Sequence, residues 1–240
     1  MTGEQLASVF AATGPVLLDF DGPVCNLYAG DLNAHASQNL FNRLRNAGVD
    51  VPEALESERD PLAVLRFAGG LGRPDLAAEM DQALSAIERK AVSSAPVTDG
   101  SEDFLRACTE TGRPVIVVSN NAAEAIHAYL ALHDISGLVK ATIGRRHGRP
   151  EFMKPHQWPV NIALSILLKP PDECVLIGDS ATDIEVSHKI GMRCIAYVKA
   201  SDRWGRLAGA RPDAMTESMA RLAEEARRCH GQGSVWRSNG

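Results

Sequence analysis

Two runs of mainly apolar residues constrain the fold more than any other feature: PVIVVS at Pro114–Ser119 and CVLIG at Cys174–Gly178. A strand with one face in water alternates apolar and polar residues, whereas these runs do not alternate, so they predict strands buried on both faces. Two stretches with helical spacing lie between these runs, at Ala123–Leu132 and Pro159–Leu168. Alternating strands and helices build a parallel sheet covered by helices. We therefore expect an α/β fold with a doubly wound, Rossmann-like parallel sheet.

The same alternation extends to both sides of these runs. A first core strand at Val16–Asp19 ends at Gly22 and Pro23, which are turn formers. The other predicted elements are strands at Val139–Ile143 and Cys194–Val198 and helices at Asp183–Ile190 and Glu217–Arg228.

The segment between the first strand and Pro96 has a different pattern. Apolar residues such as Leu40 and Leu44 recur there at helical spacing, and the pattern contains no convincing strand. We predict an all-helical cap domain inserted into the α/β core, followed by a polar, flexible tail. The predicted bounds are 1–27 and 96–229 for the core, 28–95 for the cap and 230–240 for the tail.

Composition argues against several classes of function. The 240 residues carry a net charge of −5 without a long basic stripe, so the chain lacks the positive surface that nucleic-acid binding uses. No apolar run approaches the ~18 residues of a membrane span, and the first basic residue is Arg43, which argues against a signal peptide. The five cysteines are odd in number and form no close pair, so reduced thiols are expected. We expect a cytoplasmic protein that binds neither nucleic acid nor membrane, and the sequence favours no particular oligomeric state.

Polar side chains follow three of the predicted strands, where ligands of a parallel α/β sheet bind. They are Asp19 and Asp21 after the first strand, Ser119 and Asn120 after the second, and Asp179 and Asp183 after the fourth, with Lys154 from the connection before it. Buried carboxylates repel one another, so three of them at one sheet edge favour a bound cation. Oxygen ligands without His or Cys nearby favour a hard ion, and we therefore predict Mg²⁺.

The segments LLDFDGPV, VVSNN, Lys154-Pro155 and GDSATD resemble the four ordered motifs of the haloacid dehalogenase-like (HAD) superfamily of hydrolases. The resemblance extends from about Val16 to Ala200. The helical insertion is similar to the C1-type cap of the phosphoglycolate phosphatase and β-phosphoglucomutase branch. The resemblance implies a Mg²⁺-dependent phosphohydrolase that cleaves a small phosphorylated metabolite, a phosphomonoester.

The resemblance also implies roles for the acidic residues. Asp19 would attack the phosphoryl group and form an aspartyl-phosphate. Asp21 would protonate the leaving group and then take a proton from water. The metal ligands would be the carboxylates of Asp19 and Asp179 and the carbonyl of Asp21, with Asp183 acting directly or through water. For Asp183 the alternative is an acid in the first turn of a helix, which the helix dipole stabilises without a metal.

The phosphoryl oxygens would be held by the Ser119 hydroxyl, the Asn120 amide and Lys154, as the resemblance implies. Gly22 would supply an amide and a flexible turn. One position departs from the family pattern, because Pro23 stands where Thr or Val is usual. Proline has neither a hydroxyl nor a backbone donor, so this position makes no such hydrogen bond.

Two basic features outside the motifs have alternative interpretations. The stretch Arg145–Arg149 is typical of a solvated loop, and alternatively forms a site for a second anionic group on the substrate. Arg73 follows a Gly-rich turn of the cap and is a candidate for substrate specificity.

Two other functions share these motifs with a phosphatase. One is a sugar-phosphate phosphomutase, which differs in what the cap does with the intermediate. The other is a non-catalytic HAD-like protein that binds a metabolite or a partner protein, which would show a damaged set of acids. Dehalogenase activity is disfavoured because Asp21 is present.

Overall fold

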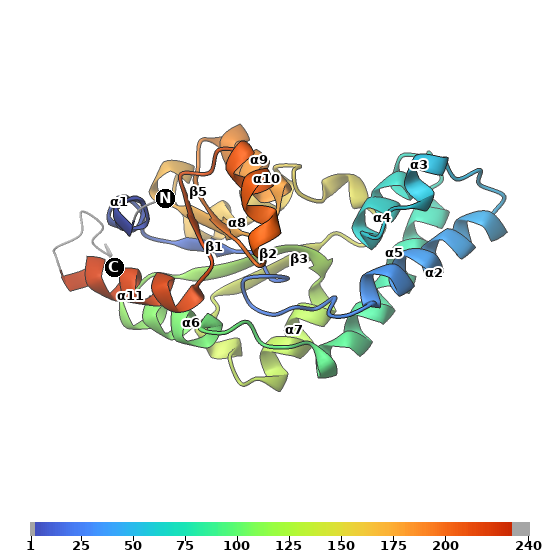
Figure 1. The fold of residues 1–240 in the computed structure, drawn as a ribbon. Helices are drawn as coiled ribbons and strands as arrows, with labels where there is room; N and C mark the ends of the chain where they lie inside the picture. The colour runs from blue at the N-terminus through green and yellow to red at the C-terminus, as the bar shows by residue number, and fades with distance from the viewer. Residues whose placement is uncertain (1–2, 232–240) are drawn as a thin grey trace.

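A single parallel sheet of six strands organises the computed structural model, which describes residues 3–231 (Figure 1). The strands are β1 Val16–Leu18, β2 Val115–Ala122, β3 Ala141–Arg145, β4 Val175–Gly178, β5 Arg193–Tyr197 and β6 Ala214–Thr216. Their order across the sheet is β3-β2-β1-β4-β5-β6, and every neighbouring pair is parallel. The chain thus builds the sheet in opposite directions from β1, which confirms the predicted doubly wound α/β fold.

Helices cover both faces of this sheet (Figure 1). They are α1 Gly3–Ala12, α6 Ser101–Glu110, α7 Ala123–Leu132, α8 Trp158–Leu167, α9 Ala181–Ile190, α10 Trp204–Gly209 and α11 Met219–Gly231, with short 3-10 helices at Val92–Ser94, Ser136–Leu138, Pro150–Phe152, Pro171–Glu173 and Ser201–Arg203. Successive residues of a strand face opposite sides. Val16 and Leu18 of β1 accordingly pack with residues of α1, α6, α7 and α11, while Leu17 packs with residues of α8, α9 and α10. The uninterrupted apolar runs are explained by burial on both faces.

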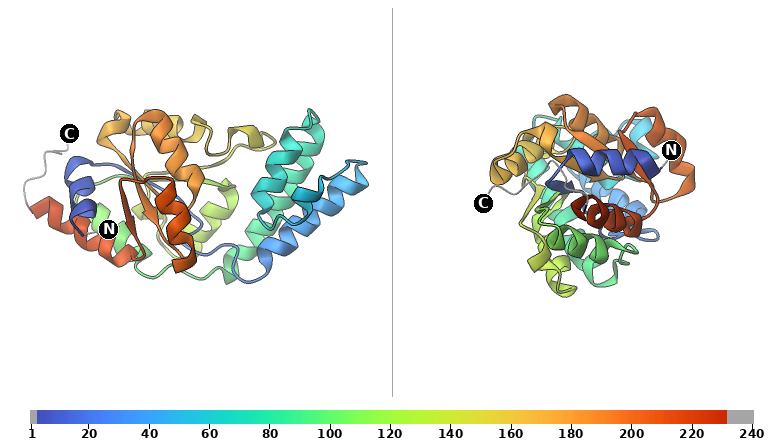
Figure 2. Two further views of the ribbon diagram at one scale, coloured as in Figure 1. Left: turned by 45° about the horizontal axis from the view of Figure 1, so that its top comes forward. Right: turned by 90° about the vertical axis from the view of Figure 1, so that its left-hand side faces the viewer.

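The segment between β1 and β2 is entirely helical within its regular elements, as predicted. Before α6, its α-helices are α2 Leu32–Asn46, α3 Glu53–Glu56, α4 Pro61–Gly69 and α5 Pro74–Ala91. They stand beyond one side of the sheet (Figure 2), where α5 contacts α7. Leu40, Leu65 and Leu84 are fully buried among them. We call this helical insertion the cap.

Several elements were not predicted. β6 is only three residues long, which is too short for a periodic pattern. α1 and α6 lie in stretches that the sequence analysis left unassigned, although Phe10 and Phe104 on these helices are fully buried. The predicted tail begins inside α11, which extends to Gly231, and its residues 232–240 lie outside the described residues.

Two other expectations concern reduced cysteine thiols and the absence of a membrane span. All five cysteines are unpaired and buried. Among residues 3–231, no helix combines the length and apolar character needed to cross a membrane.

Phe104 provides a test of the packing beneath the sheet. Its ring meets that of Phe10 edge to face, with centroids 6.3 Å apart. Phe104→Ala should lower the free energy of unfolding by about 3–5 kcal/mol, because it removes apolar contacts and leaves a cavity. Urea denaturation measures this change. Leu132, on the surface of α7 and 58% exposed, is the control, and Leu132→Ala should change the free energy by no more than about 0.5 kcal/mol. Equal effects of the two variants would contradict the described packing.

Candidate active site

The candidate site lies at the carboxyl ends of β1 and β4, where the strand order reverses. Asp19 directly follows β1, and Asp179 directly follows β4. The two strands are neighbours, and the backbone N–H of Asp19 donates to the carbonyl of Ile177 at 2.8 Å. Sheet pairing therefore brings together two acids that are 160 positions apart in the sequence.

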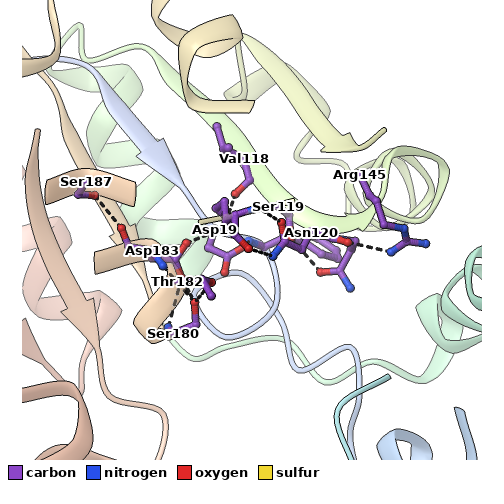
Figure 3. A network of polar contacts seen from close by, with 12 residues as sticks. Asp19, Val118, Ser119, Asn120, Arg145, Ser180, Thr182, Asp183 and Ser187 are labelled. Atoms are coloured by element: carbon purple, nitrogen blue, oxygen red, sulfur yellow. Dashed lines mark hydrogen bonds and ion pairs between the residues drawn. The ribbon is translucent and has the colours of Figure 1, made fainter. Parts of the chain in front are cut away.

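Lys154 lies at the centre of these acids and is 1% exposed. Its Nζ is 3.0 Å from Asp19 Oδ1 and 2.6 Å from Asp183 Oδ1, and it also donates to the carbonyl of Val118 at 2.8 Å. Figure 3 shows Val118, Asp19 and Asp183, which belong to three different segments, close to one another. The structure thus joins the first, third and fourth motifs around one ammonium group.

Burial dominates the electrostatics of the site. It raises the pKa of Asp19 to about 7, against the opposing charge of Lys154. Burial, followed by the nearby charges of Asp19 and Asp21, raises the pKa of Asp179 well above its usual value. For Lys154, burial favours the neutral form, but Asp183 and Asp19 outweigh it and raise the pKa. The site therefore holds more negative charge than one ammonium group can neutralise.

A cation would relieve this excess of negative charge. Asp19, Asp179 and Asp183 each place a carboxylate oxygen within 4.8 Å of the others, and all three residues are buried. Such an all-oxygen set suits a hard divalent ion such as Mg²⁺. These residues can therefore hold a metal, as the sequence analysis predicted.

Asp183 also stabilises the start of α9. Its N–H donates to Ser180 Oγ, while its Oδ2 accepts from the backbone N–H of Ser180 at 3.2 Å, so the two residues form a capping box. The alternative interpretation of Asp183 as a helix N-terminal acid is thus confirmed. Because its Oδ1 simultaneously pairs with Lys154, this role and a metal-supporting role involve the same side chain.

Asp21 is more accessible than Asp19, with 25% of its side chain exposed against 10%. The backbone N–H of Leu27 donates to Asp21 Oδ1 at 2.7 Å. Burial raises the pKa of Asp21, and the charge of Lys199, whose Nζ is 3.7 Å from Asp21 Oδ1, opposes this rise. Asp21 is therefore a carboxyl that holds its proton to a higher pH than usual.

Gly22 lies in the tight turn that follows β1. Its N–H donates to the carbonyl of Cys25 at 2.7 Å, so the amide assigned to phosphate binding is used inside the turn. Its φ is +112°, and a Cβ built there would be 2.6 Å from Asp179 Cγ. Gly22 is therefore required because it lets the backbone turn tightly against a buried carboxylate.

The Asn120 side chain is engaged by Lys154. Its Nδ2 donates to the carbonyl of Lys154 at 3.1 Å, and its Oδ1 accepts from the N–H of Lys154 at 2.7 Å. The side chain thus holds the Lys154 backbone through both of its polar atoms. Ser119 Oγ donates to Asn121 Oδ1 at 2.9 Å, so it too is engaged within β2.

Two arginines of the cap make different contacts, Arg73 within the cap and Arg66 with the core. Arg73 donates to the carbonyl of Ala47 at 3.0 Å and is exposed, so its guanidinium joins two segments of the cap. Arg66 of α4 instead donates to the carbonyl of Lys154 at 3.3 Å. One exposed arginine among many carries no distinguishing pattern in sequence, so Arg66 is recognised only once the cap is placed against the core.

Two cations beside the acids were also missed. Lys199 lies near Asp21, and Arg203 Nη1 is 3.4 Å from Asp179 Oδ2. Both follow β5 at the same sheet edge as the acids. The strand-end rule would have identified them had it been applied to the CIAYV strand.

Arg145 is not in a solvated loop. It ends β3 and is 7% exposed, with its guanidinium paired to Asp81 and Glu88 of α5. The prediction fails here because the loop meets the cap. Arg146, His147 and Arg149 are exposed, as a solvated loop requires.

Comparison with known proteins identifies the family. The model of the haloacid dehalogenase-like hydrolase family matches residues 16–197, so the chain belongs to this family and the resemblance seen in the sequence is confirmed. The solved structure of a predicted phosphatase from Clostridium acetobutylicum covers 89% of this chain and 97% of its own, with a TM-score of 0.68 and 16% identity. CbbY from Rhodobacter sphaeroides, solved in complex with phosphate, covers 88% and 96%, with a TM-score of 0.63 and 18% identity.

A curated relative has a closer sequence over a shorter span. PpaX from Caldanaerobacter subterraneus subsp. tengcongensis, to which a pyrophosphatase activity has been ascribed, is 26% identical over 133 residues. The match includes 55% of this chain and 60% of PpaX.

Gly22→Ala tests the close approach of the turn to Asp179. The variant combines a strained positive φ with a Cβ that collides with the carboxylate, so it should lose about 2–4 kcal/mol of folding stability. Gly30→Ala is the matched control, because Gly30 has a φ of +64° and no atom within 4 Å of its built Cβ. Thermal unfolding of both proteins measures the difference, which isolates the contact with Asp179. Equal losses in the two variants would contradict that contact.

Proposed function

We propose that the chain is a Mg²⁺-dependent phosphohydrolase that cleaves a small phosphomonoester through an aspartyl-phosphate on Asp19. The observation that carries this proposal is the buried cluster of Asp19, Asp179 and Asp183 around Lys154. Membership of the haloacid dehalogenase-like hydrolases supports it.

Asp19 is the nucleophile in this proposal. The N–H of Phe20 and the Nζ of Lys154 both contact Asp19 Oδ1, at 2.7 Å and 3.0 Å. We therefore assign the attack to Oδ2. A bond forms between this oxygen and phosphorus while the bond from phosphorus to the leaving oxygen breaks. Lys154 holds the carboxylate in a fixed orientation during this step.

Asp21 moves the protons. Its raised pKa suits a general acid that protonates the leaving oxygen as the bond to phosphorus breaks. In the second step, Asp21 takes a proton from water, the water oxygen bonds to phosphorus, and the bond to Asp19 breaks to release inorganic phosphate. The greater exposure of Asp21 supports assigning the proton transfers to Asp21 and the attack to Asp19, because the substrate and the water both arrive from solvent.

Mg²⁺ fits the carboxylate set and would supply positive charge beside the phosphoryl oxygens. Asp19 and Asp179 would hold it with their carboxylates, Asp21 with its carbonyl, and Asp183 directly or through water. Lys154 provides a second, permanent positive charge beside Asp19.

The substrate class follows from the same chemistry. A small phosphorylated metabolite matches a phosphoryl site next to a helical cap, which would exclude bulk water and select the leaving group. The names of the relatives point to phosphate chemistry as well, as a phosphatase and as a pyrophosphatase. We further propose a cytoplasmic location.

Asp19→Asn tests the nucleophile. In a screen of phosphorylated metabolites without a bisphosphate activator, the wild type should release inorganic phosphate, and Asp19→Asn should lower kcat at least about 10³-fold. The control is Asp103→Asn, which removes an exposed acid and should leave kcat unchanged. Turnover that survives Asp19→Asn would exclude Asp19 as the nucleophile. Turnover that requires a bisphosphate activator would favour the phosphomutase.

Removal of the metal gives a separate test. EDTA should abolish turnover, and excess Mg²⁺ should restore it. Mg²⁺ should also raise the Tm of the wild type, because it relieves repulsion among buried carboxylates and binds only the folded state. Asp179→Asn should melt at a higher temperature than the metal-free wild type but gain nothing from Mg²⁺.

Differential scanning fluorimetry with and without Mg²⁺ measures these shifts. The exposed Asp172 provides the control, because Asp172→Asn should respond to Mg²⁺ as the wild type does. Turnover that resists EDTA would contradict metal dependence.

A further inference from the structure

Arg145 occupies an unusual position for a charged side chain, because only 1% of it is exposed. It lies where β3 meets the cap, and its guanidinium donates in several directions. The acceptors are Asp81, Ser85 Oγ at 3.0 Å, the two Glu88 oxygens at 3.1 Å each, and the carbonyl of Asn120 at 2.8 Å. Figure 3 shows Arg145 directed at Asn120.

One face of α5 is built to receive this arginine. Asp81, Ser85 and Glu88 are spaced four and three residues apart, so they share one side of the helix. The apolar residues of α5, such as Met80 and Leu84, contact the hydrophobic core of the molecule from the same helix. α5 therefore carries a polar stripe beside its apolar one.

Glu88 ties the same stripe to the end of β2. It is fully buried and accepts from Tyr28 Oη at 2.6 Å, from Asn121 Nδ2 at 3.0 Å and from the N–H of Ala122 at 3.0 Å. Four donors, counting Arg145, thus converge on one carboxylate. The end of β2, which contains Ser119 and Asn120, is fastened to a cap helix.

Asn120 connects this junction to the catalytic cluster. Its carbonyl accepts from Arg145, and its side chain holds both the N–H and the carbonyl of Lys154. Lys154 in turn contacts Asp19 and Asp183. An unbroken series of hydrogen bonds therefore runs from Glu88 through Arg145, Asn120 and Lys154 to Asp19.

A second contact from the cap ends on the same segment. Arg66 of α4 donates to the Lys154 carbonyl, the group that Asn120 also binds. Gly69 of α4 lies so close to Pro150 that a built Cβ would collide with its ring. α4 thus contacts the segment that carries Lys154 directly, while α5 reaches it through Arg145 and Asn120.

We propose that Arg145 and Glu88 are positioning residues, which set the place of Lys154 relative to Asp19 and so couple the cap to the chemistry. This inference rests on the proposed function of Asp19. A buried ion pair is a weak source of stability, because desolvation offsets its attraction, and neutral side chains of similar volume often support a fold equally well. Only the charged fork of Arg145, however, can donate to Glu88 and Asn120 together.

The alternative is that the pair merely holds the cap on the core. A variant without the buried charges separates holding the cap from positioning Lys154. Its Tm should recover if the charges matter only for stability, whereas its kcat should stay low if they position Lys154. Arg145→Met alone removes the buried guanidinium from Asp81 and Glu88, although His147 and the Gly148 N–H still contact Asp81, and it should lower the Tm by several degrees. Adding Asp81→Asn and Glu88→Gln removes both stranded charges and should restore most of that loss, although nothing then binds the Asn120 carbonyl.

The experiment measures Tm, kcat and KM of the wild type, of Arg145→Met and of the triple variant. We expect the triple variant to regain Tm but to keep a kcat about 10- to 100-fold below that of the wild type, with a smaller change in KM, because small displacements of catalytic groups cost rates of that order. Arg227→Met, which removes an exposed ion pair with Asp103, is the control and should keep the wild-type kcat.

Hydrogen exchange gives a readout that does not need activity. The Lys154 amide donates to Asn120 Oδ1, so exchange in the segment 150–158 should be faster in the triple variant even where its Tm is restored. Glu88→Gln alone serves if the triple variant does not fold. It turns one buried acceptor into a donor that faces other donors, so it should lower the Tm by a few degrees and kcat about 3- to 10-fold, and exchange is then compared well below its Tm.

A triple variant, or Glu88→Gln in its place, with wild-type kcat and unchanged exchange in 150–158 would overturn the proposal. Loss of activity together with unchanged exchange would also overturn it, because Lys154 would not have moved. If instead the wild type and Asp19→Asn are equally inactive, the proposed function fails, while the exchange measurement still decides whether Arg145 and Glu88 position Lys154.

Discussion

Repulsion among buried carboxylates is the constraint on which the rest of this structure depends. Asp19, Asp179 and Asp183 place oxygens within 4.8 Å of one another, with the single ammonium group of Lys154 among them. Folding such a cluster away from water is unfavourable unless each charge is held by specific partners. The surrounding residues provide them, since Asn120 fixes the backbone of Lys154 and Ser180 fixes Asp183 in a capping box. The repulsion among these carboxylates lowers folding stability, which is consistent with a site arranged for a cation and a phosphoryl group.

Glycine makes this crowding sterically possible. A Cβ built on Gly22 would collide with Asp179, and one built on Gly178 would collide with Asp183. Both glycines lie at ends of the central strands β1 and β4, where backbone and carboxylates approach most closely. The sequence predicted an amide and a flexible turn at Gly22, and the structure adds the absence of a side chain next to Asp179.

The parts of the site that could be predicted from sequence are those set by local pattern. The apolar runs of β1 and β4 mark where strands end, and parallel pairing then brings Asp19 and Asp179 to one edge without any further information. The roles of Asn120, Arg66 and Arg145 could not be found this way, because each depends on a partner that the fold supplies from far along the chain. Arg145 and Glu88, for example, are 57 residues apart. For the fold itself, the short β6 was missed because three residues carry no period.

The cap illustrates why helical spacing alone was insufficient. Spacing revealed the apolar stripe of α5 at Leu76, Met80 and Leu84, which contributes to the hydrophobic core. The same helix has a second stripe at Asp81, Ser85 and Glu88, which a search for apolar periodicity reads as a solvated face. A buried polar stripe requires a partner with several donors, and a guanidinium supplies them in a fixed geometry. Arg145 at the end of β3 and the polar stripe of α5 are therefore one feature, and each explains why the other is buried.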